Sequence, residues 1–187
     1  MLTTTKKLSA PFVIGLGSGL FNAIIIGGPW DFLNALFYPI LLGGAGLVYG
    51  LFTAPYFEII STTQTKLRSA TWIVTSFISY TLSFWLVLFI TPDDVLPILG
   101  AIGFATGGAL GALILVIGFH RTFSKLSLLQ GSITVVAGSL IPLLLFNILQ
   151  EDIFLSYGLY PTWQAIMTTF LAYWLYANKE QPYNSRG

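Results

Sequence analysis

The sequence contains no cysteine and very little charge. Only 8% of its 187 residues are Asp, Glu, Lys or Arg, whereas a soluble domain carries about 25%. Without cysteine the chain can form no disulfide, thiolate metal site or iron–sulfur cluster, and it has no cysteine nucleophile. With so few charges, a chain of this length could not solvate a surface that faces water. We therefore expect the lipid bilayer to be its solvent.

The chain also has a single histidine and almost no net charge. The net charge is +1, and nucleic-acid binding needs a clustered basic face, so we expect no nucleic-acid partner. One histidine, His120, cannot supply a bis-histidine haem or the three or four ligands of a typical metal site. The signatures of zinc proteases, P-loop proteins and serine hydrolases are missing. We predict no enzyme activity, no catalytic residue and no metal site, and leave any cofactor open.

Long apolar runs fill most of the chain. The run 97–120 has no charge before His120 and is long enough to cross a bilayer as one helix. Polar or proline-containing turns separate it from similar runs. Together these runs predict an all-α, polytopic bundle of six transmembrane helices, at roughly Pro11–Gly28, Leu33–Phe57, Ala70–Ile90, Pro97–His120, Leu128–Leu149 and Pro161–Ala177. An N-terminal segment (1–10) and a polar tail (178–187) would flank the bundle (11–177).

The basic residues predict an orientation. In the six-span arrangement, all lysines and arginines fall on one side of the membrane: Lys6, Lys7, Lys66, Arg68, Arg121, Lys125, Lys179 and Arg186. Five carboxylates fall on the other side: Asp31, Asp93, Asp94, Glu151 and Asp152. Because cytoplasmic loops carry the excess of basic residues, both termini are predicted to be cytoplasmic. The membrane would be a plasma membrane or an internal photosynthetic one.

Small residues recur every four positions in three of the predicted spans. The glycines concerned are Gly15 and Gly19, Gly46 and Gly50, and Gly103, Gly107 and Gly111. Residues four apart lie on one face of a helix, and small residues let helices approach closely in lipid. We predict that these faces pack helices together, within the chain or against a partner. The alternative is that they leave room for a flat ligand such as a quinone, carotenoid or chlorophyll.

Glu58 is the first candidate binding residue. It continues the small-residue face of the second span, so its carboxylate is expected to point into the bundle near the cytoplasmic end. A carboxylate inside a membrane indicates a functional site by default, here a gate or proton site. The alternative is that Glu58 lies among the headgroups and pairs with Lys66, Arg68 or Arg121.

Three further polar residues are candidates for binding. Asn22 and Asn147 are both expected in the outer half of the membrane, where each could line a solute path or bond a neighbouring helix. His120 could relay protons or bind a pigment. Equally, it could be a favourable cation at the C-terminus of its helix.

These patterns favour a non-enzymatic membrane subunit that packs against other membrane proteins or against itself in a larger complex. The alternative is a small transporter or channel for a solute or ion, or the membrane-embedded substrate-binding subunit of one. Its path would run between the first, second and fourth spans, with Glu58 as gate and Asn22 as polar lining. A membrane enzyme acting on lipid would require a buried polar cluster that the pattern does not reveal.

Overall fold

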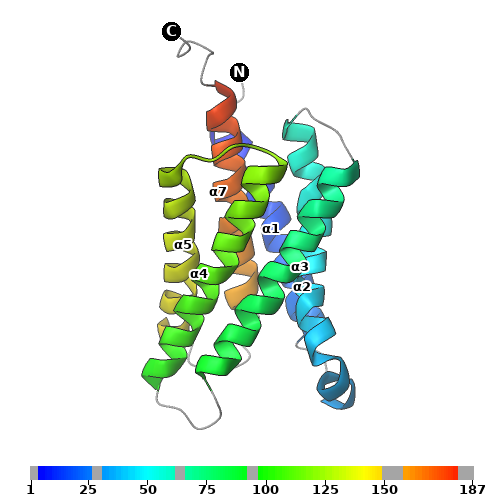
Figure 1. Cartoon of the computed structure of the whole chain (residues 1–187), viewed down its shortest axis with the longest axis vertical. Helices are drawn as coiled ribbons and strands as arrows, with labels where there is room; N and C mark the ends of the chain where they lie inside the picture. The colour runs from blue at the N-terminus through cyan, green and yellow to red at the C-terminus, as the bar shows by residue number, and fades with distance from the viewer. Residues whose placement is uncertain (1–3, 27–30, 62–65, 92–96, 149–157, 181–187) are drawn as a thin grey trace.

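The computed structural model describes residues 4–26, 31–61, 66–91, 97–148 and 158–180, which form six helices and no strand (Figure 1). The helices are α1 (Thr4–Ile26), α2 (Asp31–Ser61), α3 (Lys66–Ile90), α4 (Pro97–Thr122), α5 (Leu128–Ile148) and α7 (Tyr160–Glu180). The predicted all-α class is confirmed. Each predicted span coincides with most of one helix.

Five of the six described helices are longer than the predicted spans, α1 and α2 by the most. α1 begins at Thr4 and α2 continues past Phe57 to Ser61. The residues that extend α2 include two isoleucines, and the Ser61 hydroxyl donates a hydrogen bond to the Glu58 carbonyl (3.2 Å). Glycine-rich α4 would be a poor helix in water, because each glycine costs about 1 kcal/mol relative to alanine. Lipid offers the backbone no competing partner, so the helix is favoured there.

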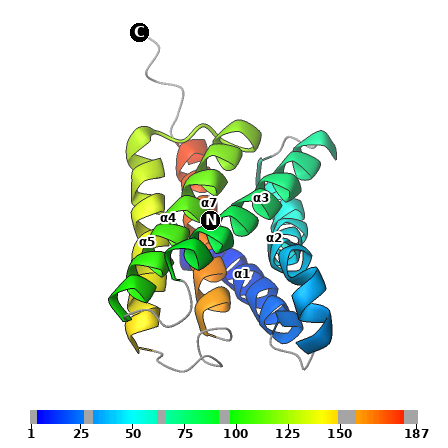
Figure 2. The same ribbon diagram turned by 60° about the horizontal axis from the view of Figure 1, so that its bottom comes forward.

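The helices close into a ring. Each of α2, α3, α4 and α5 packs against the next along the chain, and α7 packs against α5 and along α1. α1 in turn contacts α2, which completes the ring (Figure 1). Figure 2 shows the bundle turned so that the end opposite the C-terminus comes forward. α1 begins and α7 ends at the same end of the bundle (Figure 1).

Three of the described helices are long and apolar enough to cross a membrane. The qualifying stretches are Leu67–Ile90 in α3, Ile98–Thr122 in α4 and Leu128–Ile148 in α5. α1 contains a shorter apolar stretch, Leu8–Ile24. Large apolar side chains also cover the outside: on α3 alone, Val74, Ile78, Leu82, Trp85 and Phe89 are exposed. A helix that is apolar all round is typical of a membrane span.

An aromatic cluster joins α2, α3 and α4. It consists of Phe57, Trp72, Phe119 and Phe123, all buried. Their rings meet edge-on or tilted, with centroids 5.0 Å apart for Phe57–Phe119 and 5.5 Å for Phe57–Trp72. Such geometries bring the positive edge of one ring toward the negative face of another. The cluster therefore fixes the mutual position of the three helices.

The turn between α4 and α5 is held by its own side chains. The Ser127 hydroxyl accepts from the Gln130 N–H (3.2 Å), and the Gln130 side chain accepts from the Ser127 N–H (2.9 Å). This reciprocal pair is a capping box, which satisfies two otherwise free N–H groups at the start of α5. The His120 Nδ1 accepts from the Leu126 N–H (2.9 Å).

The C-terminal turn of α7 is hydrogen-bonded to two other parts of the bundle. The Asn178 side chain donates to the Lys125 carbonyl (2.9 Å) and to the Ser124 hydroxyl (3.1 Å). It also accepts from the Gln130 side chain (2.9 Å). On the other side, the Lys179 ammonium donates to the carbonyl of Ile60, near the end of α2. One turn of α7 thus ties the α4–α5 turn to α2.

The capping box gives a first prediction. Ser127→Ala removes the hydroxyl that satisfies the Gln130 N–H and should lower the free energy of unfolding by about 1 kcal/mol. Reversible unfolding in mixed detergent micelles measures this. Ser132→Ala, at an exposed position of the same helix, is the matched control. If the two variants were equally stable, the capping box would not stabilise the start of α5.

Candidate functional site

The two predicted asparagines occupy different environments. Asn22 is buried in α1, where its Nδ2 donates to the Ala45 carbonyl of α2 (3.1 Å). Asn147 is exposed on α5, and its Nδ2 donates to the Leu143 carbonyl of the same helix (2.7 Å). Asn22 therefore links two helices, whereas Asn147 closes a bond within its own.

Glu58 and His120 both have local partners. The Glu58 carboxylate is half-buried and accepts a hydrogen bond from the Ser69 hydroxyl of α3. In the described part of the chain it forms no ion pair with Arg68 or Arg121, and the Lys66 side chain lies outside that part. His120 is exposed, with its Nδ1 engaged at the α4–α5 turn. The four predicted binding residues are not brought together into one site.

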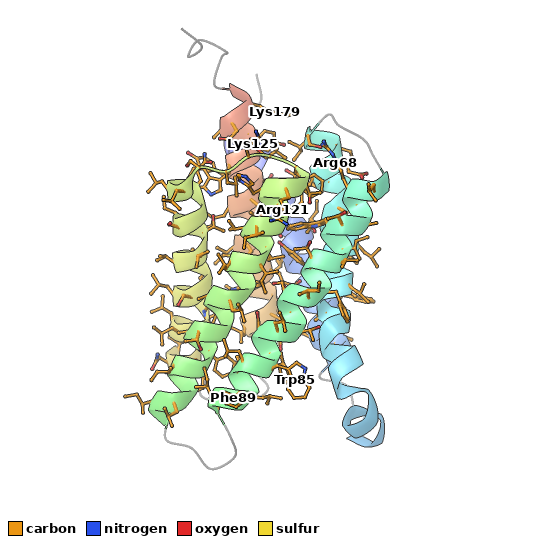
Figure 3. The ribbon with its side chains drawn as sticks, viewed as in Figure 1. Arg68, Trp85, Phe89, Arg121, Lys125 and Lys179 are labelled. Atoms are coloured by element: carbon orange, nitrogen blue, oxygen red, sulfur yellow. The ribbon has the colours of Figure 1, made fainter. Side chains whose placement is uncertain are left out.

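The basic residues gather at one end of the bundle. Figure 3 shows Arg68, Arg121, Lys125 and Lys179 at one end and Trp85 and Phe89 toward the other. Between these ends, the buried polar residues of the described chain are all uncharged. No group of three or more His, Cys, Asp or Glu residues that could hold a metal ion occurs among the described residues.

The seven glycines of the predicted packing faces all lie against another helix. A Cβ placed on Gly15 would lie 2.5 Å from the Gln164 carbonyl oxygen of α7, and one on Gly50 would lie 2.7 Å from the Ile73 Cα of α3. The others meet comparable obstacles: Gly19 meets α7; Gly46, Gly107 and Gly111 meet α3; and Gly103 meets Thr91, the residue after α3. The nearest atoms belong to the neighbouring backbone at Gly15, Gly19, Gly46 and Gly50, and to neighbouring side chains at Gly103, Gly107 and Gly111. A side chain at any of the seven positions would therefore have to displace its neighbour.

The closest helix approaches also allow hydrogen bonds between helices. The Ser79 hydroxyl of α3 donates to the Gly111 carbonyl of α4 (2.8 Å). The Trp163 indole of α7 donates to the Gly138 carbonyl of α5 (3.0 Å). Both carbonyls belong to glycines, whose missing side chains leave their helix backbone open to a neighbour.

A buried group of uncharged polar residues occupies the interior where α1, α2, α3 and α7 contribute side chains. We call this group the polar centre. It consists of Ser18 from α1, Tyr49 from α2, Ser76 and Tyr80 from α3, and Gln164 and Thr168 from α7. All six are less than 9% exposed. The polar centre was not predicted from the sequence.

Part of the polar centre is fully hydrogen-bonded. The Ser18 hydroxyl donates to the Gln164 side-chain oxygen (2.6 Å). The Thr168 hydroxyl donates to the Gln164 carbonyl (2.7 Å) and lies 3.1 Å from the Tyr49 hydroxyl. Because Thr168 has one hydroxyl hydrogen, Tyr49 is left as the donor to Thr168. These bonds join α1, α2 and α7.

The remaining atoms of the polar centre have no partner. Among the described residues, the Ser76 hydroxyl, the Tyr80 hydroxyl and the Gln164 side-chain nitrogen make no hydrogen bond. The Gln164 side chain lies beside the Tyr80 hydroxyl, so each is available to the other as a hydrogen-bond partner. An unpartnered buried polar group costs about 1–3 kcal/mol, so these three atoms call for an explanation.

Two aromatic rings lie beside the Tyr80 ring. The Tyr80 ring lies 5.8 Å from the Tyr49 ring and 5.5 Å from the Trp163 ring, centroid to centroid. The polar centre contains no carboxylate, imidazole, ammonium or guanidinium group, so it offers no general acid or base that works near neutral pH. It can form hydrogen bonds with an uncharged partner.

The sequence pattern hides the polar centre because its members come from four separate segments. Ser18 and Gln164 are 146 positions apart. The last predicted span gave the available signal, because it is the least apolar of the six. Within it, Gln164 and Thr168 are four positions apart and so lie on the same helix face.

No protein-family model, curated protein or solved structure matches this chain.

Two glycines of α1 allow a matched test of helix packing. Gly15→Leu places a side chain against the α7 backbone and should destabilise the protein by about 1–3 kcal/mol or prevent folding. Gly17 has no atom within 4 Å of its Cβ position, so Gly17→Leu should leave the unfolding transition nearly unchanged. Thermal unfolding in detergent distinguishes the two. Equal loss in both variants would mean that α1 needs glycine for a reason other than its contact with α7.

Proposed function

We propose that this protein is a six-span integral membrane protein with both ends in the cytoplasm. The four cations labelled at one end in Figure 3 support this orientation, because basic residues gather on the cytoplasmic side. The exposed aromatic residues Trp85 and Phe89 toward the other end suit the opposite interface. α1, α2 and α7 would be the spans beyond the three that length and hydropathy identify.

We further propose that it acts as a non-enzymatic subunit of a larger membrane complex. The outer face of α1 is the observation that carries this proposal. Gly17 has open space at its Cβ position, while Val13 and Phe21, one turn away on either side, are 62% and 46% exposed. A glycine between two large side chains is a place where another transmembrane helix can approach closely.

We propose that the interior takes part in hydrogen bonding and packing. The buried polar residues in the described part of the chain are Ser, Thr, Asn and Gln, together with the buried tyrosines Tyr49 and Tyr80. None is a general acid or base near neutral pH. Glu58 and His120, the titratable residues proposed from sequence, lie near the basic end, with partners in the protein itself.

The subunit role predicts that Gly17→Leu releases a partner without unfolding the chain. After extraction in mild detergent, the wild-type protein should migrate with a stoichiometric partner, either another membrane protein or a second copy. Native mass spectrometry identifies which. Gly17→Leu should lose that partner, whereas Val136→Leu, at an exposed position on α5, should retain it. A wild-type protein that is monomeric in every mild detergent would contradict the subunit role.

A solute path is a second candidate function, and the unpartnered atoms of the polar centre favour it. Such a path would draw its polar lining from α1, α2, α3 and α7, whereas the sequence suggested the first, second and fourth spans. Glu58, half-buried near the basic end, would be its gate.

This second candidate predicts that Glu58→Gln slows solute entry. Proteoliposomes shocked with acetamide or glycerol should swell faster than empty liposomes, as stopped-flow light scattering records. Glu58→Gln should bring the rate near that of empty liposomes at equal protein content. Ser69→Ala, which removes the partner hydroxyl but keeps the carboxylate, should retain most of the rate. Unchanged swelling in Glu58→Gln would exclude the gate.

A further inference from the structure

The peptide group that joins Lys125 to Leu126, in the turn between α4 and α5, is hydrogen-bonded on both sides. Its N–H donates to the Nδ1 of His120, in the last turn of α4, at 2.9 Å. Its carbonyl oxygen accepts from the Asn178 side chain of α7, also at 2.9 Å. This single peptide group therefore connects α4 to α7, and the two bonds together fix the course of the turn.

The bond to His120 requires a neutral imidazole. A ring nitrogen that accepts a hydrogen bond carries no hydrogen, so the one hydrogen of the neutral ring is on Nε2. A protonated imidazole has a hydrogen on both nitrogens and accepts nothing. Two N–H groups cannot point at each other across 2.9 Å, so protonation turns the ring away and leaves the Leu126 N–H without this partner.

His120 lies where a proton from water can reach it. Its side chain is exposed, and so are those of Arg121 and Lys125 close by in the chain. Figure 3 shows these two cations at the basic end of the bundle. Long cationic side chains at the end of a membrane helix extend to the aqueous interface, so His120 is in contact with water at the same level.

His120 is the titratable member of this turn. The other hydrogen-bonding side chains there belong to Ser127, Gln130 and Asn178, which do not ionise. α5 contains no titratable residue. The titratable side chains described at this end of the other neighbouring helices are Arg68 on α3, Tyr176 and Lys179 on α7, and Glu58 on α2. Histidine is the side-chain type whose charge ordinarily changes between about pH 5 and 8.

We infer that His120 is a pH-sensitive switch: its neutral imidazole holds the Lys125–Leu126 peptide group against α4, and its protonation releases the turn from α4. Because the bond needs the neutral ring, it is present at the upper end of this pH range and is lost as the pH falls. After release, the peptide group is still bonded to Asn178. The inference concerns contacts within one chain and does not depend on either proposed function.

The test measures the mobility of the turn in the full-length protein in lipid nanodiscs. Because the chain has no native cysteine, a nitroxide spin label on Leu128→Cys, at a position 89% exposed, reports on this turn alone. The ratio of mobile to immobile label should rise about fivefold between about pH 8 and about pH 5, the effect of one lost hydrogen bond. A label on Ile98→Cys, 65% exposed at the other end of α4, should show no change.

Two substitutions of His120 separate the acceptor from the charge. His120→Asn provides an amide oxygen at the position of Nδ1, an acceptor that does not titrate, so the Leu128 label should stay immobile throughout the pH range. His120→Ala has no acceptor, so the label should be mobile throughout. Both changes are at an exposed position. If His120→Ala fails to fold, His120→Asn alone decides the test.

A pH response of the Leu128 label that His120→Asn abolishes supports the switch. The inference is overturned if the wild-type label does not respond to pH, or if His120→Asn responds equally. It is also overturned if the label in His120→Ala is as immobile as in the wild type at about pH 8. The single histidine allows a direct check by NMR with isotope-labelled histidine. At the same pH the ring hydrogen should be on Nε2, and a hydrogen on Nδ1 would contradict the bond.

Discussion

Close backbone contact at glycine is the interaction on which the rest of this bundle depends. In lipid, apolar side chains gain little by leaving the solvent, so helices associate through packing and hydrogen bonds. α3 shows the result, since glycines of α2 face it on one side and glycines of α4 on the other. The Ser79–Gly111 hydrogen bond exists because Gly111 has no side chain to keep the helices apart. α1 meets α7 in the same way through Gly15 and Gly19.

This mode of packing also determines what the interior can do. Helices that touch at the backbone leave space only for short or flat side chains, and the described interior holds hydroxyls, amides and aromatic rings. Most hydroxyls bond to the carbonyl four residues earlier, as Thr53 does with Tyr49 (2.7 Å), and so need no outside partner. Others bond to a neighbouring helix, as Ser79 does with the Gly111 carbonyl and Ser18 does with the Gln164 side chain. The chemistry available in the polar centre is hydrogen bonding between uncharged groups.

The repeating patterns predicted the helices, but the single polar residues did not reveal the site. Seven glycines at intervals of four identified which faces pack, because periodicity reports a face directly. It does not report the neighbour: Gly46 and Gly107 both face α3, which has no glycine of its own. Glu58 was expected to point into the bundle, and its carboxylate accepts a hydrogen bond from Ser69 of α3. Asn147 looked equivalent to Asn22, yet it bonds its own helix. The hydrogen-bond partner of each polar side chain depends on how its helix is rotated about its axis. The residues near that side chain in the sequence do not determine this rotation.

The contact between α1 and α7 has a consequence for the making of the protein. Chains emerge from the ribosome N-terminus first, and 146 positions separate Ser18 from its partner Gln164. Throughout the synthesis of the four described helices in between, the small-residue face of α1 and the Ser18 hydroxyl are without their final neighbour. The ring can close only when α7 joins the other helices. Biogenesis must therefore hold α1 in an unfinished state, shielded by the insertion machinery or by lipid, until the last described helix arrives.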